Sequence, residues 1–154
     1  FTGEEILVIK KPPITAPTFS LSTTEGDENY IEERFLCFAY RYRYENNQYS
    51  ATSQFSNPAF QSGPFDYNDA SQLNDGMQNA KNEINITYNS GGALVKGIDI
   101  LFKESNSNII KVARKFDKAV DGLADNKLTQ RDELKKWNNI RKLIKLVLLI
   151  MYLL

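Results

Sequence analysis

Hydrophobic and polar residues alternate along much of this chain, and the pattern is clearest over residues 36–44. Every even position in that segment is large and hydrophobic or aromatic, whereas the later odd positions are Arg41 and Arg43. A period of two predicts a β-strand with one aromatic face and one charged face. The sequence Glu-Asn-Asn-Gln at 45–48 is typical of a hairpin turn, so we expect residues 49–56 to return as the antiparallel partner strand.

The expected partner strand has two different faces. One face carries Tyr49, Ala51, Ser53 and Phe55, and the other carries Ser50, Thr52, Gln54 and Ser56. Short alternating segments predict further strands at 5–9, 18–22, 84–88, 98–103 and 110–112. Six or seven short strands at this spacing predict a mainly β domain, an antiparallel β-sandwich most like the fibronectin type III or immunoglobulin architecture.

A long polar segment, residues 57–82, lies between these strands. It contains two prolines and two glycines and shows no sustained periodicity, which indicates a loop. Because about 25 residues is long for a simple connection, we expect an elaborated loop with a role at the surface. Its aromatic residues Phe65 and Tyr67 are therefore included in the candidate interaction surface.

The pattern changes to intervals of three and four after Lys127. Apolar residues, Trp137 among them, then recur with lysines and arginines between them, which predicts a C-terminal amphipathic helix. Beyond Lys145 this helix is apolar on every side, so it would pack on the domain, join a partner or lie on a membrane surface, the last being the lesser alternative. We divide the chain into an N-terminal strand and Pro-rich linker (1–17), a β-sandwich (18–118) and a helical tail (119–154).

Composition narrows the function by exclusion. The 154 residues include no histidine and one cysteine, Cys37, which excludes histidine triads, most zinc sites and an internal disulfide. Nineteen basic and nineteen acidic residues give no net charge that would suggest nucleic acid as a partner. The charges are unevenly spread, since residues 1–110 hold 8 basic and 14 acidic residues and residues 111–154 hold 11 and 5. We expect no catalytic, cofactor-binding or metal site.

The aromatic strand offers one candidate for binding. Three alternating tyrosines with arginines between them could form a platform on which sugars or single strands stack. Aromatic residues at a period of two are more often the core face of a strand, so the platform is the lesser alternative. The candidate interaction surface consists of Tyr40, Arg41, Tyr42, Arg43, Tyr44, Phe65, Tyr67 and Trp137.

A calcium loop is the second candidate. The order of Asp121, Asp125, Lys127, Thr129 and Asp132 partly matches the ligand spacing of such a loop. Asn126 stands where the loop requires glycine, and Leu123 stands at a ligand position. A helix start preceded by acidic residues explains the same sequence, and we prefer that interpretation.

Two long segments of the chain resemble a known family. These are ERFLCFAYRYRYENNQYSATSQFSNPAF (33–60) and KGIDILFKESNSNIIKVARKFDK (96–118), and the opening EEILVIKKPPITAP (4–17) is similar as well. They resemble the tail stabilisation protein of crAss-like bacteriophages, which are podovirus-type phages of gut bacteria. The resemblance covers residues 4–125 and implies a non-enzymatic virion protein that acts as a homo-oligomer.

The resemblance sets the expected function and location. It implies a tail assembly module that contacts other tail and portal-proximal subunits in the virion, after assembly in the cytoplasm of the bacterial host. We expect the chain to be an N-terminal fragment of a larger protein, with a frame-shifted end after residue 126. The alternative is a fibronectin-like binding module of a bacterial surface or secreted protein, with a carbohydrate or protein ligand.

Overall fold

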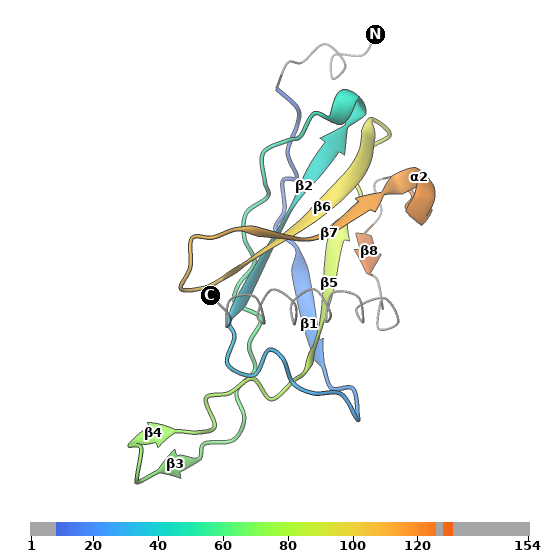
Figure 1. Ribbon diagram of the computed structural model, residues 1–154. Coiled ribbons are helices and arrows are strands. Elements are labelled where there is room, and N and C mark those ends of the chain that lie inside the picture. The colour runs from blue at the N-terminus through green and yellow to red at the C-terminus, as the bar shows by residue number, and fades with distance from the viewer. Residues whose placement is uncertain (1–8, 126–127, 131–154) are drawn as a thin grey trace, which may run out of the picture.

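The described part of the chain is built mainly from β-strands in antiparallel sheets (Figure 1). A computed structural model describes residues 9–125 and 128–130. The elements, in chain order, are β1 (Thr18–Ser22), β2 (Leu36–Tyr44), the 3-10 helix η1 (Glu45–Asn47), β3 (Tyr67–Asn68), β4 (Leu73–Asn74), β5 (Glu83–Asn89), β6 (Val95–Glu104), β7 (Lys111–Asp117), α2 (Lys118–Asp121) and β8 (Leu128–Gln130). The predicted strands at 18–22, 36–44, 84–88 and 98–103 are confirmed.

Three sheets are present among the described residues. One has the strand order β1-β5-β8, the second has the order β2-β6-β7, and the third is the two-stranded β3-β4 hairpin. Every pairing is antiparallel. In the second sheet Tyr40 lies opposite Ile100, and Ile98 lies opposite Phe116, which puts these four hydrophobic residues on the same face.

Both three-stranded sheets contribute to a single hydrophobic core. The alternation of β5 buries Ile84, Ile86 and Tyr88, while the partly buried residues between them point away. The ring of Tyr88 lies 6.0 Å from that of Tyr40 on β2 and 5.6 Å from that of Phe116 on β7. Aromatic contacts therefore join β5 of one sheet to two strands of the other.

The tyrosines of β2 belong to this core. Tyr40 is 1% exposed and Tyr42 is 7% exposed, and their rings pack edge to face. Burial raises the pKa of the Tyr42 hydroxyl above its ordinary value, and the neighbouring Tyr40 adds to the shift. The stacking platform considered from the sequence is therefore not exposed at these two positions, because the aromatic face of the strand is its core face.

The segment after β2 differs from the expected return strand. The backbone N–H groups of Ser50, Ser53 and Ser56 donate to the carbonyls of Tyr42, Tyr40 and Phe38, at 2.9, 2.8 and 2.7 Å. The N–H of Ala59 continues the series to the carbonyl of Leu36, at 2.8 Å. Three residues of this segment thus match two residues of β2, and we call residues 50–59 the serine segment.

The serine hydroxyls make the unequal match possible. Each Oγ of Ser50, Ser53 and Ser56 accepts a 3.0 Å hydrogen bond from the N–H of its partner on β2. Each also donates to the carbonyl of the next residue in its own segment. The prediction of two alternating faces for 49–56 was wrong, because side chain to backbone bonds replace the regular strand pairing.

The start of the expected helical tail also differs. Asp117 caps the four-residue helix α2 by accepting hydrogen bonds from the N–H groups of Ala119 and Val120. Residues 128–130, predicted as helix, instead form strand β8, which pairs with β5. The remaining tail, with Trp137, lies outside the described residues, as do residues 1–8, which include all but the last residue of the strand predicted at 5–9.

Candidate protein-interaction surface

Arg41 and Arg43 lie on the face of β2 opposite the tyrosine core. The Nε and Nη2 groups of Arg41 both donate hydrogen bonds to Oδ2 of Asp99 on β6, at 3.1 and 2.9 Å. Arg43 binds Asp117 at the end of β7, at 3.0 Å. The two arginines predicted for the interaction surface therefore cross-link the strands of their own sheet.

Two aromatic rings, one from Tyr49 just before the serine segment and one from Phe55 within it, lie against cations near this face. The guanidinium of Arg41 lies 4.2 Å from the centre of the Tyr49 ring, and the ammonium of Lys103 lies 4.8 Å from that of Phe55. Asp99 is fully buried, and its Oδ1 has no hydrogen-bond partner among the residues that the structure describes. The charged groups of this face therefore bind within the chain, while the side chains of Arg41 and Arg43 stay 30% and 24% exposed.

Tyr44 occupies the end of β2 and is partly buried. Its hydroxyl donates to the carbonyl of Lys11, at 2.8 Å, and the ammonium of Lys10 lies 5.8 Å from its ring centre. This residue therefore fastens the proline-rich entry segment to the sheet. Of the eight residues predicted for the surface, five belong to β2 and serve packing or ion pairing.

Two of the three predicted residues outside β2, Phe65 and Tyr67, lie on a projection from the body of the protein, and the third, Trp137, lies outside the described residues. Residues 61–80, which we call the arm, contain the β3-β4 hairpin and extend away from the larger sheets (Figure 1). The expectation of an elaborated loop at 57–82 matches this element. Isolated two-stranded hairpins are marginally stable in water, so the arm depends on its polar contacts and its anchor.

Asn79 anchors the arm to the body. It is 1% exposed, its N–H donates to the carbonyl of Glu32 at 2.7 Å, and its amide donates to that of Ala59 at 3.2 Å. Its Oδ1 accepts from the N–H of Gln61 at 3.3 Å. One buried asparagine therefore holds both ends of the arm, and a buried amide that is hydrogen-bonded in this way favours a single arrangement.

Asn74 organises the outer part of the arm. Its Oδ1 accepts hydrogen bonds from the N–H groups of Asp66, at 2.9 Å, and Gly76, at 3.1 Å. The N–H of Asp75 donates to the carbonyl of Asp66, at 2.7 Å, and that of Gly63 donates to the carbonyl of Gly76, at 3.0 Å. These bonds define the arm without burying hydrophobic side chains.

The arm instead holds four large apolar side chains in solvent. Phe65 is 77% exposed, Tyr67 52%, Leu73 64% and Met77 54%. The rings of Phe65 and Tyr67 are nearly parallel, with centres 6.5 Å apart. Sequence reasoning selected the two aromatic residues but missed Leu73 and Met77, because no periodic pattern in the segment marks them.

The charges of the arm all have one sign. Asp66, Asp69 and Asp75 lie within residues 61–80, and no lysine or arginine does. Asp66 and Asp69 are exposed. The arm therefore presents an apolar surface within a negative field.

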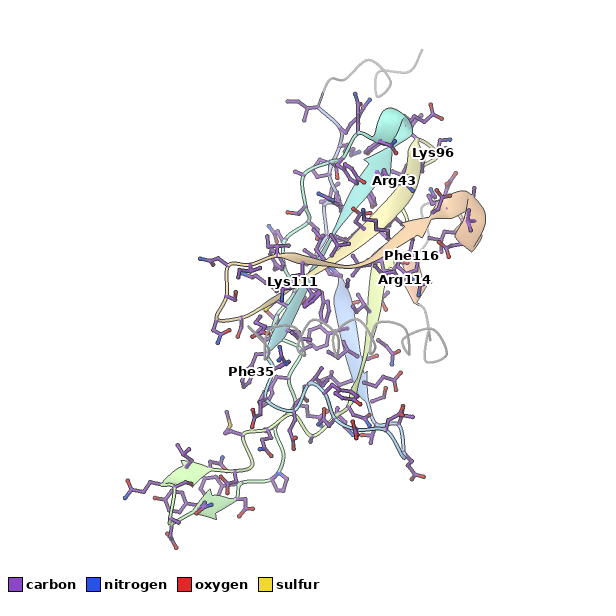
Figure 2. The ribbon with its side chains drawn as sticks, in the orientation of Figure 1. Phe35, Arg43, Lys96, Lys111, Arg114 and Phe116 are labelled. Carbon is purple, nitrogen blue, oxygen red and sulfur yellow. The ribbon has the colours of Figure 1, made fainter. Side chains whose placement is uncertain are left out.

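The edge of the β2-β6-β7 sheet has the opposite charge. Residues 105–116, which we call the basic edge, contain Lys111, Arg114 and Lys115 and no acidic residue. Figure 2 shows Lys111 and Arg114 along β7. The same segment exposes three aliphatic side chains, which are Ile109 at 67%, Ile110 at 50% and Val112 at 39%.

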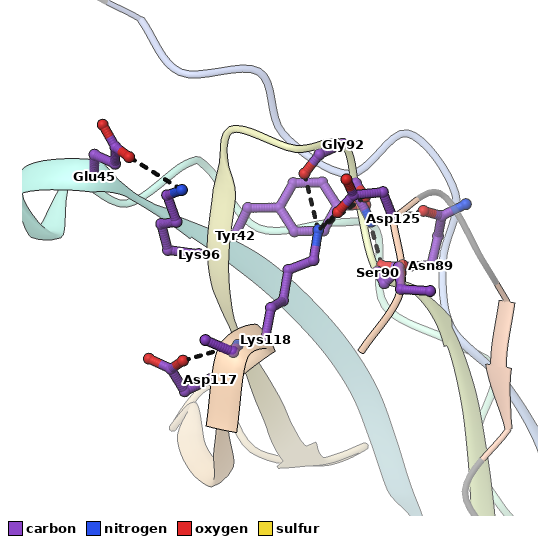
Figure 3. A network of polar contacts seen from close by, with 12 residues as sticks. Tyr42, Glu45, Asn89, Ser90, Gly92, Lys96, Asp117, Lys118 and Asp125 are labelled. Carbon is purple, nitrogen blue, oxygen red and sulfur yellow. Dashed lines mark hydrogen bonds and ion pairs between the residues drawn. The ribbon is translucent and has the colours of Figure 1, made fainter. Parts of the chain in front are cut away.

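A polar network ties α2 to the turn between β5 and β6 (Figure 3). The buried ammonium of Lys118 donates to the carbonyls of Gly91, at 3.2 Å, and Gly92, at 2.9 Å, and pairs with Asp125 at 2.5 Å. The Oγ of Ser90 donates to the carbonyl of Ala124 at 2.5 Å. Asp125, which the calcium interpretation would need as a ligand, is therefore paired with Lys118.

Within the described residues we find neither a cluster of metal ligands nor a helix that could span a membrane. No group of three or more histidine, cysteine, aspartate or glutamate side chains within 9–125 is placed to hold a metal ion. Asp121 accepts a 2.9 Å hydrogen bond from the N–H of Asp117. In the same part of the chain, no helix has the length and apolar character needed to cross a membrane.

Comparison with known proteins adds no family. No protein-family model, curated protein or solved structure matches the chain. The arm and the basic edge are therefore interpreted from their own chemistry.

Proposed function

We propose that this chain is a structural module of a phage virion, of the tail stabilisation type, and that it acts through protein–protein contacts as a homo-oligomer. The observation that carries the proposal is the arm, with its four exposed apolar side chains. Two of them, Phe65 and Tyr67, stack on each other in solvent, and exposed apolar patches on a protein commonly mark interaction sites. The resemblance of residues 33–60 and 96–118 to crAss-like phage tail stabilisation proteins supplies the biological setting.

The body suits the role of a rigid support. We interpret its two three-stranded sheets and their shared core as a β-sandwich of fibronectin type III-like architecture. Loops that carry function are positioned by such scaffolds. Asn79 would then transmit the orientation of the body to the arm, since it bonds to both.

The alternative is a binding module of a bacterial surface or secreted protein. The parallel rings of Phe65 and Tyr67 favour it, because flat exposed aromatic faces can stack on sugar rings or bases. Leu73 and Met77 favour a protein partner instead, because they have no planar face and adapt to apolar surfaces.

Mass spectrometry of purified virus particles tests the proposal. Trypsin cleaves after Lys81 and Lys96 and releases residues 82–96, a peptide suited to detection. We expect this peptide in gradient-purified particles from the source of the gene, and we expect it to remain after a high-salt wash. Recovery of the peptide from the bacterial envelope, with none in particles, would contradict the virion role and support the surface module.

A further inference from the structure

We infer that the arm of one copy docks on the basic edge of a second copy, so that copies associate head to tail. The inference rests on the proposed function, because it names the partner of the arm that function requires. It commits to a second copy of this chain because the two surfaces needed for the contact are both present on one molecule and complement each other.

Charge is the first element of complementarity. Three acidic residues and no basic residue lie in 61–80, and three basic residues and no acidic residue lie in 105–116. Opposite fields of this kind steer two surfaces together and disfavour the like-charged alternative, which here is arm against arm. The charge pattern therefore selects the basic edge as the partner of the arm.

Apolar surface is the second element. The arm exposes the stacked rings of Phe65 and Tyr67, at 77% and 52%, and the basic edge exposes Ile109 and Ile110, at 67% and 50%. Each surface thus combines large apolar side chains with charges of a single sign. Burying the apolar groups would supply affinity, while the surrounding charges would set the orientation.

The third element is the open side of β7. The sheet order is β2-β6-β7, and the serine segment already bonds to the outer side of β2. In the part of the chain that the structure describes, no strand pairs with the other side of β7. An open strand edge accepts a strand from another chain, and the short hairpin strands β3 and β4 can supply one.

The contact joins two different surfaces, so it is heterologous. Each copy that docks its arm leaves its own basic edge available for the next copy. Contacts of this kind produce a closed ring when the rotation between copies closes, and a filament when it does not.

Sedimentation velocity of the full chain tests the contact through charge reversal. We expect association that increases with concentration, at least a tenfold weakening for Asp66→Lys with Asp69→Lys, and the same for Lys111→Glu with Lys115→Glu. Mixing the two variants should restore association, which also shows that both fold. As a control, Lys81→Glu with Lys96→Glu lowers the net charge by the same amount as Lys111→Glu with Lys115→Glu, but at positions outside both surfaces. This variant should associate like the natural chain.

Cysteine cross-linking tests the geometry. Cys37 is buried, so introduced thiols react without competition from it. A Met77→Cys copy mixed with a Val112→Cys copy should form a disulfide-linked heterodimer, and Met77→Cys alone should form little homodimer.

The outcomes separate this inference from the proposed function. A chain that stays monomeric, or that associates equally well with the basic edge reversed, overturns the head-to-tail contact. So does a Met77→Cys homodimer that exceeds the mixed product. None of these results changes whether peptide 82–96 is found in particles, which alone decides the virion role.

Discussion

Ser53 pairs with Tyr40 through two hydrogen bonds that run in opposite directions. The N–H of Ser53 donates to the carbonyl of Tyr40 at 2.8 Å, and the N–H of Tyr40 donates to Oγ of Ser53 at 3.0 Å. In a regular antiparallel pair a backbone carbonyl would fill the second position. The hydroxyl therefore replaces a peptide group, and the stability of β2 depends on it.

Replacing Ser53 with alanine should destabilise the protein. The variant leaves the buried N–H of Tyr40 without an acceptor, which costs about 1–3 kcal/mol of unfolding free energy. Thr52→Ala, one position away and exposed, should change it by less than about 0.5 kcal/mol. Urea denaturation followed by circular dichroism gives both values, and equal midpoints for the two variants would refute the role of the hydroxyl.

Replacing Lys118 with methionine should also destabilise the protein. The side chain is 8% exposed, and its loss removes the donor for the carbonyls of Gly91 and Gly92, at about 1–3 kcal/mol. Lys96→Met is the matched control, because its ion pair with Glu45 is exposed and contributes roughly 0–1 kcal/mol. Thermal unfolding should rank Lys118→Met clearly below Lys96→Met, and the reverse order would contradict the network.

The stability of the α2 cap should depend on pH. The hydrogen bond from Arg43 lowers the pKa of Asp117 below its ordinary value of 3.8, with help from the N–H groups of Val120 and Ala119. A lowered pKa stabilises the folded state above the unfolded value, and that contribution disappears as the pH falls through the folded value. The stabilising effect of Asp117 should therefore be complete at pH 7 and absent well below pH 3.8.

Asp117→Asn isolates this effect, because asparagine still caps a helix but carries no charge. At pH 7 the variant should unfold at a lower urea concentration than the natural chain. The difference should shrink as the pH falls below 3.8. A difference that stays constant from pH 7 to pH 2.5 would show that the carboxylate charge has no part in stability.

Replacing Gly76 with alanine should disrupt the arm and spare the body. A Cβ atom at Gly76 would overlap the carbonyl oxygen of Pro64, and backbone at that point cannot give way without moving the hairpin. Gly63→Ala, across the arm, places its Cβ 3.4 Å from the carbonyl oxygen of Gly76, an ordinary contact. Hydrogen exchange should accelerate at the N–H of Asp75 only in Gly76→Ala, with unchanged exchange in β2 and β6.

The strands that could be predicted are those in which local sequence and final environment agree. The large apolar residues of β2, β5 and β6 recur with a period of two because one face of each strand meets the core. The burial itself alternates only in β5, since the other faces of β2 and β6 are also partly buried. The serine segment does not follow the period of two. It has serine or alanine at 50, 53, 56 and 59, which is a period-three signal in the sequence. That signal has meaning only once β2 is known to lie beside it.

The interaction surface was predictable only in part. Alternation separates tyrosines from arginines in β2, but it cannot tell that Arg41 will meet Asp99, because that pair depends on a strand register 58 residues apart. Asn79 and Lys118 carry no local mark of burial, since their partners come from distant turns. Phe65 and Tyr67 stood out because aromatic residues are conspicuous in a polar loop.

The serine segment restricts how the length of this chain can change. Three of its residues accompany two residues of β2, and Ser50, Ser53 and Ser56 return to the same phase at each step. Removing a triplet such as 52–54 together with two residues of β2 would keep the remaining hydroxyls in phase with β2, whereas removing one residue would put each later hydroxyl out of reach. In natural variants of this protein, we therefore expect insertions and deletions in the serine segment to come three residues at a time. Each should be accompanied by a change of two residues in β2.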